Sequence, residues 1–563
     1  MSVKLSFVSC FIFREPEETD DMIRKNLEFL VSLDIPLCIF VTQEYYNSVF
    51  LEHPRIKYRI FDNSESWISK EIAAINETIE LPENRNESKD TFSFLESGHV
   101  KHELLELAIE ENPWSSTHFA WIDFNISKIV KNQEGIKEFF HWLDYFMKEE
   151  PFLTIPGCWS KLDKDKINDI LNTVHWRFCG GFLLGDSRSV RELCELYREV
   201  LPLFLREHKK LVWDFNFWAW LETVYEERWK AIHYKGDHND SIFLCSADHY
   251  TRIIDNIIIK KEYDYPVIET YYPTSASYLF FRGEHWINTR YVNYWIYPNG
   301  CYLFNNFEGK HLIENKNMLS KLDEKTMEPI FYKEIQENID YPVNKRISVG
   351  LEDVRLYEFN GKIKYIAATT GYSSNEKSRM IVGEYDLESG TICRGQIIQP
   401  PNNIDSWCEK NWIPLIEEEK ELFIYKWYPM EIGHIDYEKG ELVIDYTIPN
   451  SFPLFSKVKG STLFYDILSH KPCEDGLLGV VHISEEYEPR HYYHMLVLLD
   501  RETYSVKNYS ETFCFEKIGI EYCIGFTPYE RDGLETKYTF WISRHDRDPL
   551  MIQILCSEIR WLK

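Results

Sequence analysis

The chain has 563 residues, of which 44% are hydrophobic and 16% aromatic, and its formal net charge is -28. A chain of this length exceeds what one hydrophobic core supports, so we expect two or three domains. Such an acidic chain is a poor match for a phosphate backbone, and we expect no nucleic-acid partner. The acidity is compatible with a neutral sugar substrate.

We expect neither a targeting signal nor a cysteine framework. No apolar run reaches the roughly 20 residues of a membrane-spanning helix, and residues 1 to 10 lack the features of a signal peptide. The thirteen cysteines are scattered, without a C-x-x-C pair. This spacing argues against a disulfide framework and against structural zinc. We therefore expect a cytoplasmic protein with no membrane span.

The first 260 residues predict an α/β domain with a mostly parallel sheet. Buried strands are expected at Val3–Phe13, Ile35–Val41 and Arg55–Phe61, with a helix ending near Leu33 between the first two. Residues 64 to 100 are polar and are interpreted as an insertion or lid, and a helix starts at Lys101. Further expected elements are a helix at 135–148, a strand at 152–156, a strand within 175–186, helices at 190–207 and 214–225, and a strand near 232.

The stretch Ser116–Ile126 is the most informative part of this domain. Alternation along a strand would place Asp123 and Asn125 on one face, where they offer two hard oxygen ligands to a divalent cation. A buried aspartate that caps the following segment is the alternative. The paired glycines Gly180 and Gly181 indicate a close approach to the backbone. Asp214 is either the N-cap of a helix or a carboxylate directed into a cleft.

Past residue 260 the pattern changes to short strands separated by Gly, Pro, Asn and Asp turns. About 300 residues of short antiparallel strands fit a five-bladed β-propeller better than a sandwich of about 100 residues. There is no exact internal repeat, so the blade number rests on length and on the resemblance described below. The predicted domains are residues 1–260 and 261–563.

These features of the first domain resemble the YibB/HtrL-type proteins, within the broader nucleotide-sugar-dependent glycosyltransferase fold. The matching features are the opening strand, Lys101 in the helix before the key strand, Trp121-Ile122-Asp123, Gly180-Gly181-Phe182 and Asp214. The usual Asp-x-Asp is Asp123-Phe124-Asn125 here. His233-Tyr234-Lys235-Gly236 is similar to a turn that supplies a third metal ligand in retaining members.

This resemblance implies a nucleotide-sugar donor and Mn²⁺ or Mg²⁺ held by Asp123, Asn125 and His233, which would neutralise the diphosphate leaving group. Lys101 and Arg177 would assist as fixed cations, and Gly180 and Gly181 would border the substrate. Asp214 would deprotonate the acceptor hydroxyl or stabilise the developing oxocarbenium ion.

The second half resembles five-bladed propellers related to glycoside hydrolase families 43 and 130. The matching segments are Pro273–Ser277, Asn288–Tyr294, Leu351–Arg355, Glu409–Pro414, Lys459–Ser461, Val481–His482, Tyr493–His494 and Ile520–Gly525. In phosphorylase-type relatives an aspartate at the Asp353 position protonates the departing sugar, while arginines and histidines hold phosphate. A structural salt bridge between Asp353 and Arg355 is the alternative.

The resemblance also implies the residues of a propeller pocket around Asp353. The expected substrate-binding residues are Arg290, Asn293, Arg355, Lys410, Asn411, His482, Tyr493, His494 and Glu521. Several cations around one carboxylate would give this pocket a positive potential and attract phosphate or sulfate.

The leading hypothesis is a glycosyltransferase that moves a sugar from a nucleotide sugar to a glycan or glycoprotein acceptor, with a propeller that binds or processes glycans. A second hypothesis makes the propeller the active part, as a phosphorylase or hydrolase beside a degenerate transferase domain. A third is a glycan-binding protein without catalysis.

Overall fold

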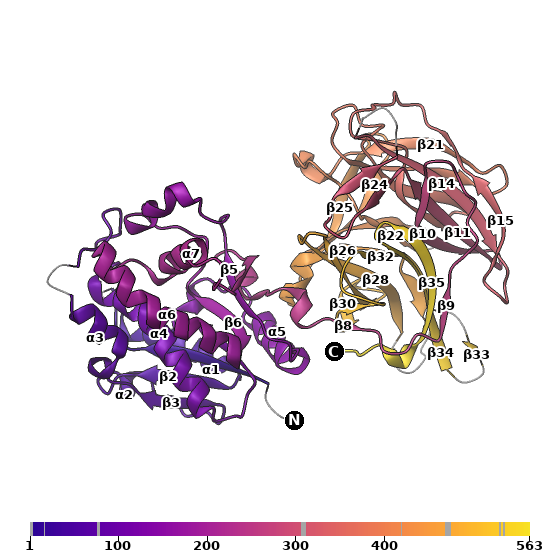
Figure 1. Cartoon of the computed structure of the whole chain (residues 1–563). Helices are drawn as coiled ribbons and strands as arrows, with labels where there is room; N and C mark the ends of the chain where they lie inside the picture. Colours follow the sequence, from indigo (N-terminus) through magenta and orange to yellow (C-terminus); the bar gives the residue numbers. More distant parts are fainter. Residues whose placement is uncertain are drawn as a thin grey trace. The chain divides into compact units, whose positions relative to one another are not determined.

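The structure is a computed structural model that describes residues 4–15, 17–75, 79–305, 311–417, 419–467, 475–528, 531–532 and 535–562, with backbone only at 403, 531, 532 and 535. The chain divides into two compact units. The first comprises Met1–Tyr250 and Ser451–Leu454, and the second comprises Thr251–Asn450 and Phe455–Lys563. Figure 1 shows an α/β arrangement in the first and strands in the second.

The first unit is built on a seven-stranded sheet with the order β3-β2-β1-β4-β6-β5-β7. Only β6 runs antiparallel to its neighbours β4 and β5, so the sheet is mostly parallel, as expected. The strands are β1 (Leu5–Phe11), β2 (Leu37–Val41), β3 (Ile56–Ile60), β4 (His118–Ile122), β5 (Leu153–Gly157), β6 (Phe182–Asp186) and β7 (Ile232–Lys235).

Helices connect these strands, and one of them starts earlier than expected. The helices are α1 (Asp20–Ser32), α2 (Tyr46–Val49), α3 (Trp67–Ala73), α4 (Phe92–Glu111), α5 (Gln133–Phe146), α6 (Ser187–His208) and α7 (Asp214–Val224). We expected α4 to start at Lys101, after an insertion or lid formed by residues 64 to 100. It starts at Phe92 because the Thr91 hydroxyl caps it, accepting from the Phe94 amide at 3.3 Å, and because Leu95 is buried.

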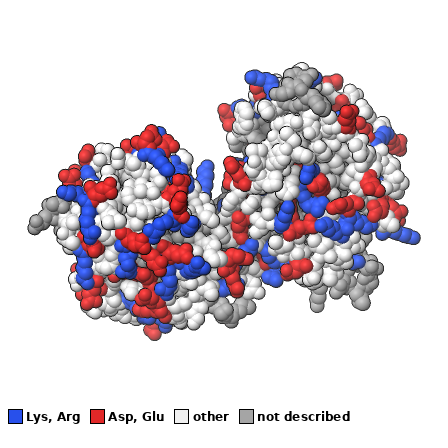
Figure 2. All heavy atoms as spheres, viewed as in Figure 1, with Lys and Arg blue, Asp and Glu red and all other residues white. Residues whose placement is uncertain are grey.

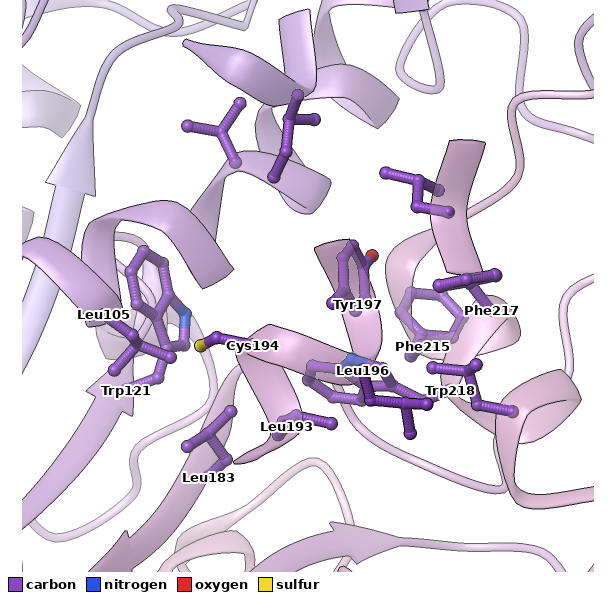
Figure 3. Packing of buried hydrophobic residues seen from close by; sticks show 14 of the residues in the cluster. Leu105, Trp121, Leu183, Leu193, Cys194, Leu196, Tyr197, Phe215, Phe217 and Trp218 are labelled. Carbon is purple, nitrogen blue, oxygen red and sulfur yellow. The ribbon is translucent and has the colours of Figure 1, made fainter. Parts of the chain in front are cut away.

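Alternating strand residues give the sheet two apolar faces. Val8 on β1 belongs to a cluster that also draws residues from α3, α4, α6 and α7. Its neighbour Phe7 points the other way and packs against Phe140 of α5, with ring centroids 4.7 Å apart. Figure 3 shows Trp121 of β4 beside Leu105 and Cys194 in the first cluster. The sheet therefore carries helices on both faces, as an α/β layer requires.

The second unit consists of successive sheets whose strands are mostly antiparallel, and these make a β-propeller, as expected. One sheet holds β10 (Tyr272–Phe281), β11 (Glu284–Val292), β14 (Ile313–Leu322) and β15 (Pro329–Glu334), with β17 (Ser348–Val349) paired to β14. The next holds β16 (Gln336–Asn338), β21 (Thr391–Ile398), β20 (Arg379–Asp386), β19 (Lys362–Thr369) and β18 (Glu352–Phe359). Another holds β22 (Ile413–Ile416), β23 (Glu421–Trp427), β24 (Met430–Asp436) and β25 (Glu441–Ile448).

The remaining sheets take strands from both ends of this unit. One holds β26 (Val458–Gly460), β28 (Gly476–Glu485), β29 (His491–Leu499), β31 (Phe513–Cys514) and β8 (Arg252–Ile253), with β27 (Tyr465–Ile467) and β30 (Val506–Tyr509) also paired to it. The last holds β32 (Glu521–Thr527), β34 (Glu535–Arg544), β35 (Arg547–Leu555) and β9 (Ile259–Lys261), with β33 (Arg531–Asp532) paired to β34. A separate pair is β12 (Tyr294–Ile296) with β13 (Tyr302–Phe304).

Strands β8 and β9 place the unit boundary at Tyr250 rather than at the expected residue 260. Arg252 pairs with Phe513 in a parallel ladder, and Lys261 pairs with Met551 in an antiparallel one. The segment from Thr251 onward therefore belongs to the propeller. The sequence alone assigned these residues to the first domain. Edge strands of two or three residues are too short to show the alternation of apolar and polar residues that marks a strand.

The surface mixes charges of both signs. Figure 2 shows basic and acidic side chains interspersed over the visible face. Within the described ranges, no helix is both long enough and apolar enough to cross a membrane.

The edge strands generate a prediction about stability. A chain that starts at Asp264 lacks β8 and β9, so two sheets lose an edge strand and expose unpaired backbone groups. We expect it to melt roughly 4 °C or more below a chain that starts at Thr251. Thermal unfolding followed by circular dichroism checks this, and equal melting temperatures would contradict the assignment of these strands.

Candidate functional site

The first unit contains a cavity of about 320 Å³ at one edge of its sheet. Residues following β1 and β4 line it, as do residues just before the antiparallel strand β6 and at the start of α7. This is the edge where the parallel strands end, the usual position of ligands in α/β sheets. Six of the residues expected at the site line this cavity: Lys101, Asp123, Asn125, Gly180, Gly181 and Asp214.

A buried ion pair forms one wall of the cavity. The Lys101 Nζ lies 2.6 Å from Asp214 Oδ2 and donates to the Gly180 carbonyl oxygen at 2.7 Å. It also lies over the rings of Trp121 and Trp218, 5.4 and 5.3 Å from their centroids. Burial disfavours the charged lysine, but Asp214 and then Asp123 outweigh it and raise the pKa of Lys101. The lysine is thus a fixed cation inside the cavity.

Asp214 is not the N-cap of α7. It is the first residue of the helix, and the N-cap position is held by Trp213 without a side-chain hydrogen bond. Asp214 is only 6% exposed, and its carboxylate is directed to Lys101. Of the two interpretations open at this position, the structure shows the carboxylate in the cavity.

Asp123 and Asn125 both line the cavity but do not share one strand face. Strand β4 ends at Ile122, and a short 3-10 helix starts at Ile126, so these residues lie in a turn where alternation does not apply. Asp123 Oδ1 accepts from the Trp121 Nε1 at 2.6 Å. Desolvation by the surrounding protein raises the pKa of Asp123, although Lys101 opposes this.

Two residues expected in the same site lie elsewhere. Arg177 forms a two-pronged pair with Glu222, Nε to Oε2 at 2.8 Å and Nη2 to Oε1 at 2.7 Å, and does not line the cavity. His233 on β7 packs close to Gly157 and is likewise absent from the lining. Burial lowers the pKa of His233 to about 4. Both expectations are therefore corrected. Arg177 is held by Glu222 on α7, and His233 packs against Gly157 on the neighbouring strand β5.

Several lining residues were not singled out from the sequence. Trp176 stacks on Phe215 with centroids 4.8 Å apart, and His238 meets Trp176 edge-on at 4.7 Å. Trp213 also stacks on Phe215. These rings give the cavity an aromatic wall suited to a planar base or a sugar ring. The aromatic residues flanking Asp214 were the available signal.

The donor set can be compared with what a divalent cation requires. Of the three expected ligands, only Asp123 and Asn125 reach the cavity, and Asn125 Oδ1 already accepts from Asn26 Nδ2 at 2.8 Å. Across the described residues, no group of three or more His, Cys, Asp or Glu side chains is placed to hold a metal. Mg²⁺ is commonly held by one or two carboxylates together with substrate phosphates. The residues therefore fit a cation that arrives with a diphosphate, not a preformed protein cage.

The second unit gathers another polar cluster from several sheets. Arg290 on β11 donates to Asp353 Oδ1 at 3.0 Å. Arg355 on β18 donates to Asn411 Oδ1 at 3.3 Å and to the Tyr522 hydroxyl at 3.2 Å. The Tyr522 hydroxyl in turn lies 3.3 Å from Asp353 Oδ2. The structure thus brings Arg290, Asp353, Arg355 and Asn411 together around Tyr522.

The charges of this cluster balance, which corrects the expected positive potential. Lys410 Nζ donates to Glu352 Oε2 at 3.1 Å. Burial would raise the pKa of Glu352, but Lys410 and Arg290 lower it to about 2. Asp546 adds a further carboxylate and accepts from the Tyr294 hydroxyl at 3.1 Å. Glu352 and Asp546 offset two of the cations. The alternative interpretation paired Asp353 with Arg355, but the side chain that pairs with Asp353 is Arg290.

The other residues expected in the propeller pocket have structural partners. Asn293 bonds the backbone of Leu312 and Glu314, and buried Glu521 accepts from three consecutive backbone amides, Phe515 to Lys517, at 2.7 to 3.0 Å. Buried His482 bonds the Ser461 hydroxyl at 2.8 Å, Tyr493 is fully buried, and His494 lies between Phe513 and Phe515. We therefore correct the pocket assignment for Asn293, Glu521, Tyr493 and His494.

Comparison with known proteins gives similarity of fold only. No family model matches the sequence, and no curated protein matches it. Among solved structures, a hypothetical protein from Leishmania major is similar at 12% identity and a TM-score of 0.34, over 53% of this chain and 90% of that one. A GDP-Man-dependent mannosyltransferase from Leishmania mexicana is similar at 13% identity and a TM-score of 0.36, over 53% and 90%. A GH43_1 enzyme from Xanthomonas citri is similar at 8% identity and a TM-score of 0.32, over 52% and 89%.

At such identities and TM-scores, these similarities carry no functional argument.

His494 generates a prediction about pH. Burial lowers the pKa of His494 from 6.5 to about 3, so its neutral form stabilises the fold fully above pH 6.5, and this contribution is lost as the pH falls toward 3. Between pH 6.5 and 4, the wild type should lose about 3 kcal/mol of its free energy of unfolding because of His494. The His494→Phe variant should not show this part of the loss. Urea unfolding at a series of pH values measures this.

The control is His434→Phe, because that side chain is 48% exposed beside Asp445. The control should follow the wild-type pH dependence. A His494→Phe profile parallel to wild type would contradict the assigned burial effect.

Proposed function

We propose that the protein is a glycosyltransferase that moves a sugar from a nucleotide sugar to a glycan or protein acceptor. The observation that carries this proposal is the cavity of about 320 Å³, which combines the Lys101–Asp214 pair and Asp123 with an aromatic wall. Its volume falls in the range typical of small-molecule sites. Its lining combines apolar and aromatic side chains with charged groups, as a ligand with a charged and a planar part requires.

The donor would use the aromatic wall and the polar groups of the cavity. Trp176, which stacks on Phe215 with one face, would offer its other ring face to the base or sugar. Lys101 places a cation where it can offset the charge of the diphosphate leaving group. Asp123 and Asn125 would hold Mn²⁺ or Mg²⁺, which when bound would neutralise the same diphosphate.

Asp214 would act on the acceptor. Its Oδ2 is held by Lys101, and its Oδ1 accepts no hydrogen bond from the described residues. A carboxylate anchored at one oxygen and open at the other can accept a proton from an acceptor hydroxyl or face developing positive charge. The fixed lysine positions it for either role.

A second candidate function is carried by the polar cluster of the propeller. We propose that the five sheets of four or more strands among the described residues of the second unit serve as five blades, and that Asp353 is the acid of a phosphorylase or hydrolase pocket. Its support is the convergence of Arg290, Asp353, Arg355 and Asn411 from segments far apart in the chain. The balanced internal pairing of its charges favours the first candidate over this one.

Donor binding tests the first proposal directly. In the presence of Mn²⁺, Asp123→Asn should weaken binding of the tightest nucleoside diphosphate in a panel by about tenfold, because one oxygen ligand becomes a neutral amide. Isothermal titration calorimetry on the full chain, with Mn²⁺ and with EDTA, measures this. Asp21→Asn, an exposed change on α1, is the control. Unchanged binding by Asp123→Asn would remove this residue from the site.

Turnover separates the two candidate functions. Asp214→Asn should lower transfer from a nucleotide sugar by roughly 10²- to 10⁴-fold with donor affinity retained, because the general base is lost. Asp353→Asn should leave transfer unchanged. Full transfer by Asp214→Asn would contradict the proposal. Phosphorolysis or hydrolysis of glycans lost only in Asp353→Asn would favour the propeller as the active unit.

A further inference from the structure

Two glycines from different elements flank the open oxygen of Asp214. Gly98 lies within α4, and Gly180 lies just before β6; both line the cavity. A Cβ added at Gly98 would lie 3.1 Å from Asp214 Oδ1. A Cβ added at Gly180 would lie 3.4 Å from the same oxygen. The space beside this oxygen is therefore bounded by two residues that lack side chains.

Backbone conformation does not require glycine at either position. Neither residue has a positive φ, whereas such conformations occur at other glycines of the chain. Gly98 lies inside a 20-residue helix, where glycine costs roughly 1 kcal/mol relative to alanine. A helix that keeps glycine at this cost indicates a use for the missing side chain.

The contacts also argue against simple close packing of the backbone. At Gly98 the three nearest heavy atoms to an added Cβ all belong to the Asp214 side chain. At Gly180 they are the two Asp214 oxygens and a Phe215 ring carbon. By contrast, a Cβ at Gly157 would lie 1.7 Å from the Arg177 carbonyl oxygen, which is a backbone packing constraint. The two cavity glycines leave room for the Asp214 carboxylate instead.

Gly181, next to Gly180, lies against the carboxylate of Asp123 in the same way. A Cβ at Gly181 would lie 3.4 Å from Asp123 Oδ2 and 3.1 Å from an Ile126 methyl group. Adjacent glycines thus open the cavity toward two different acids. This separates an Asp214 side from an Asp123 side within one site.

We propose that Gly98 and Gly180 form the entrance of the acceptor subsite, through which the acceptor hydroxyl reaches Asp214 Oδ1. The inference rests on the proposed transferase function and assigns the acceptor, a sugar or other alcohol, to this side of the cavity. Gly181 and Asp123 then border the donor. The hydroxyl would give its proton to Oδ1, and its oxygen would form the new bond to the sugar as the nucleoside diphosphate leaves.

The test compares water with larger acceptors in the full-length protein. The assay uses a nucleotide sugar that the wild type turns over. It measures how the product divides between hydrolysis and transfer to methanol, glycerol or a methyl glycoside. This ratio does not depend on the fraction of active protein. Gly98→Ala and Gly180→Ala should each shift the ratio by about tenfold from glycerol or glycoside toward water, because a methyl group narrows the entrance.

Matched variants make the result specific. Ser93→Ala, on an exposed position of α4, should leave the ratio unchanged. Gly181→Ala should weaken nucleoside diphosphate binding without changing the ratio. Urea unfolding of Gly98→Ala and Gly180→Ala checks that both variants are folded, because each added methyl group contacts the Asp214 carboxylate.

Each outcome decides a different point. If the wild type neither hydrolyses nor transfers any nucleotide sugar, the proposed function fails and this inference with it. If the wild type is active and both glycine variants keep its partition ratio, or lose hydrolysis and transfer in equal proportion, the acceptor subsite lies elsewhere.

Discussion

The buried pair of Lys101 and Asp214 is the interaction on which the first unit's cavity depends. Lys101 is 3% exposed and Asp214 6%, and both stand beside an apolar cluster of large side chains, including Trp121 and Trp218. Removing one partner of such a pair typically costs about 3 to 5 kcal/mol, because the other charge stays buried and uncompensated. Buried pairs are often no more stable than apolar replacements, so this one is better explained by what it does. It joins α4, α7 and the Gly180 backbone at one point, and the Asp214 carboxylate that it holds lines the cavity.

The two polar centres of the chain differ in how completely their charges are satisfied. In the propeller, Arg290 holds Asp353, Lys410 holds Glu352, and Arg355 bonds the Ser461 carbonyl oxygen. Charged groups that already pair with one another gain little further binding free energy from a ligand. In the first unit, Asp214 keeps an open oxygen. This difference, rather than the number of charged residues, is the reason why we propose the first unit as the active one.

Several features of the site followed from local sequence. The apolar strand before Asp123 and the glycine pair at Gly180 were visible as patterns, and Asp214 stood out among aromatic residues. Asn125 was expected on the strand face but lies in a turn, because β4 ends at Ile122. Arg177 was expected in the cavity but is neutralised by Glu222, which lies 45 residues away on α7. Such pairings depend on which helix packs where, and no spacing in the chain records them.

The sequence by itself determined the α/β character of the first half, the all-β character of the second, and the residue types available at the sheet edge. These properties follow from hydrophobic periodicity and turn residues, which act over a few positions along the chain. The tertiary structure decided which candidates meet. It brought Lys101 to Asp214 and placed Gly98 over the open oxygen, and it kept His233 out of the cavity while His238 lined it. It also assigned Thr251–Lys261 to the propeller, because edge strands are defined by their partners rather than by their own residues.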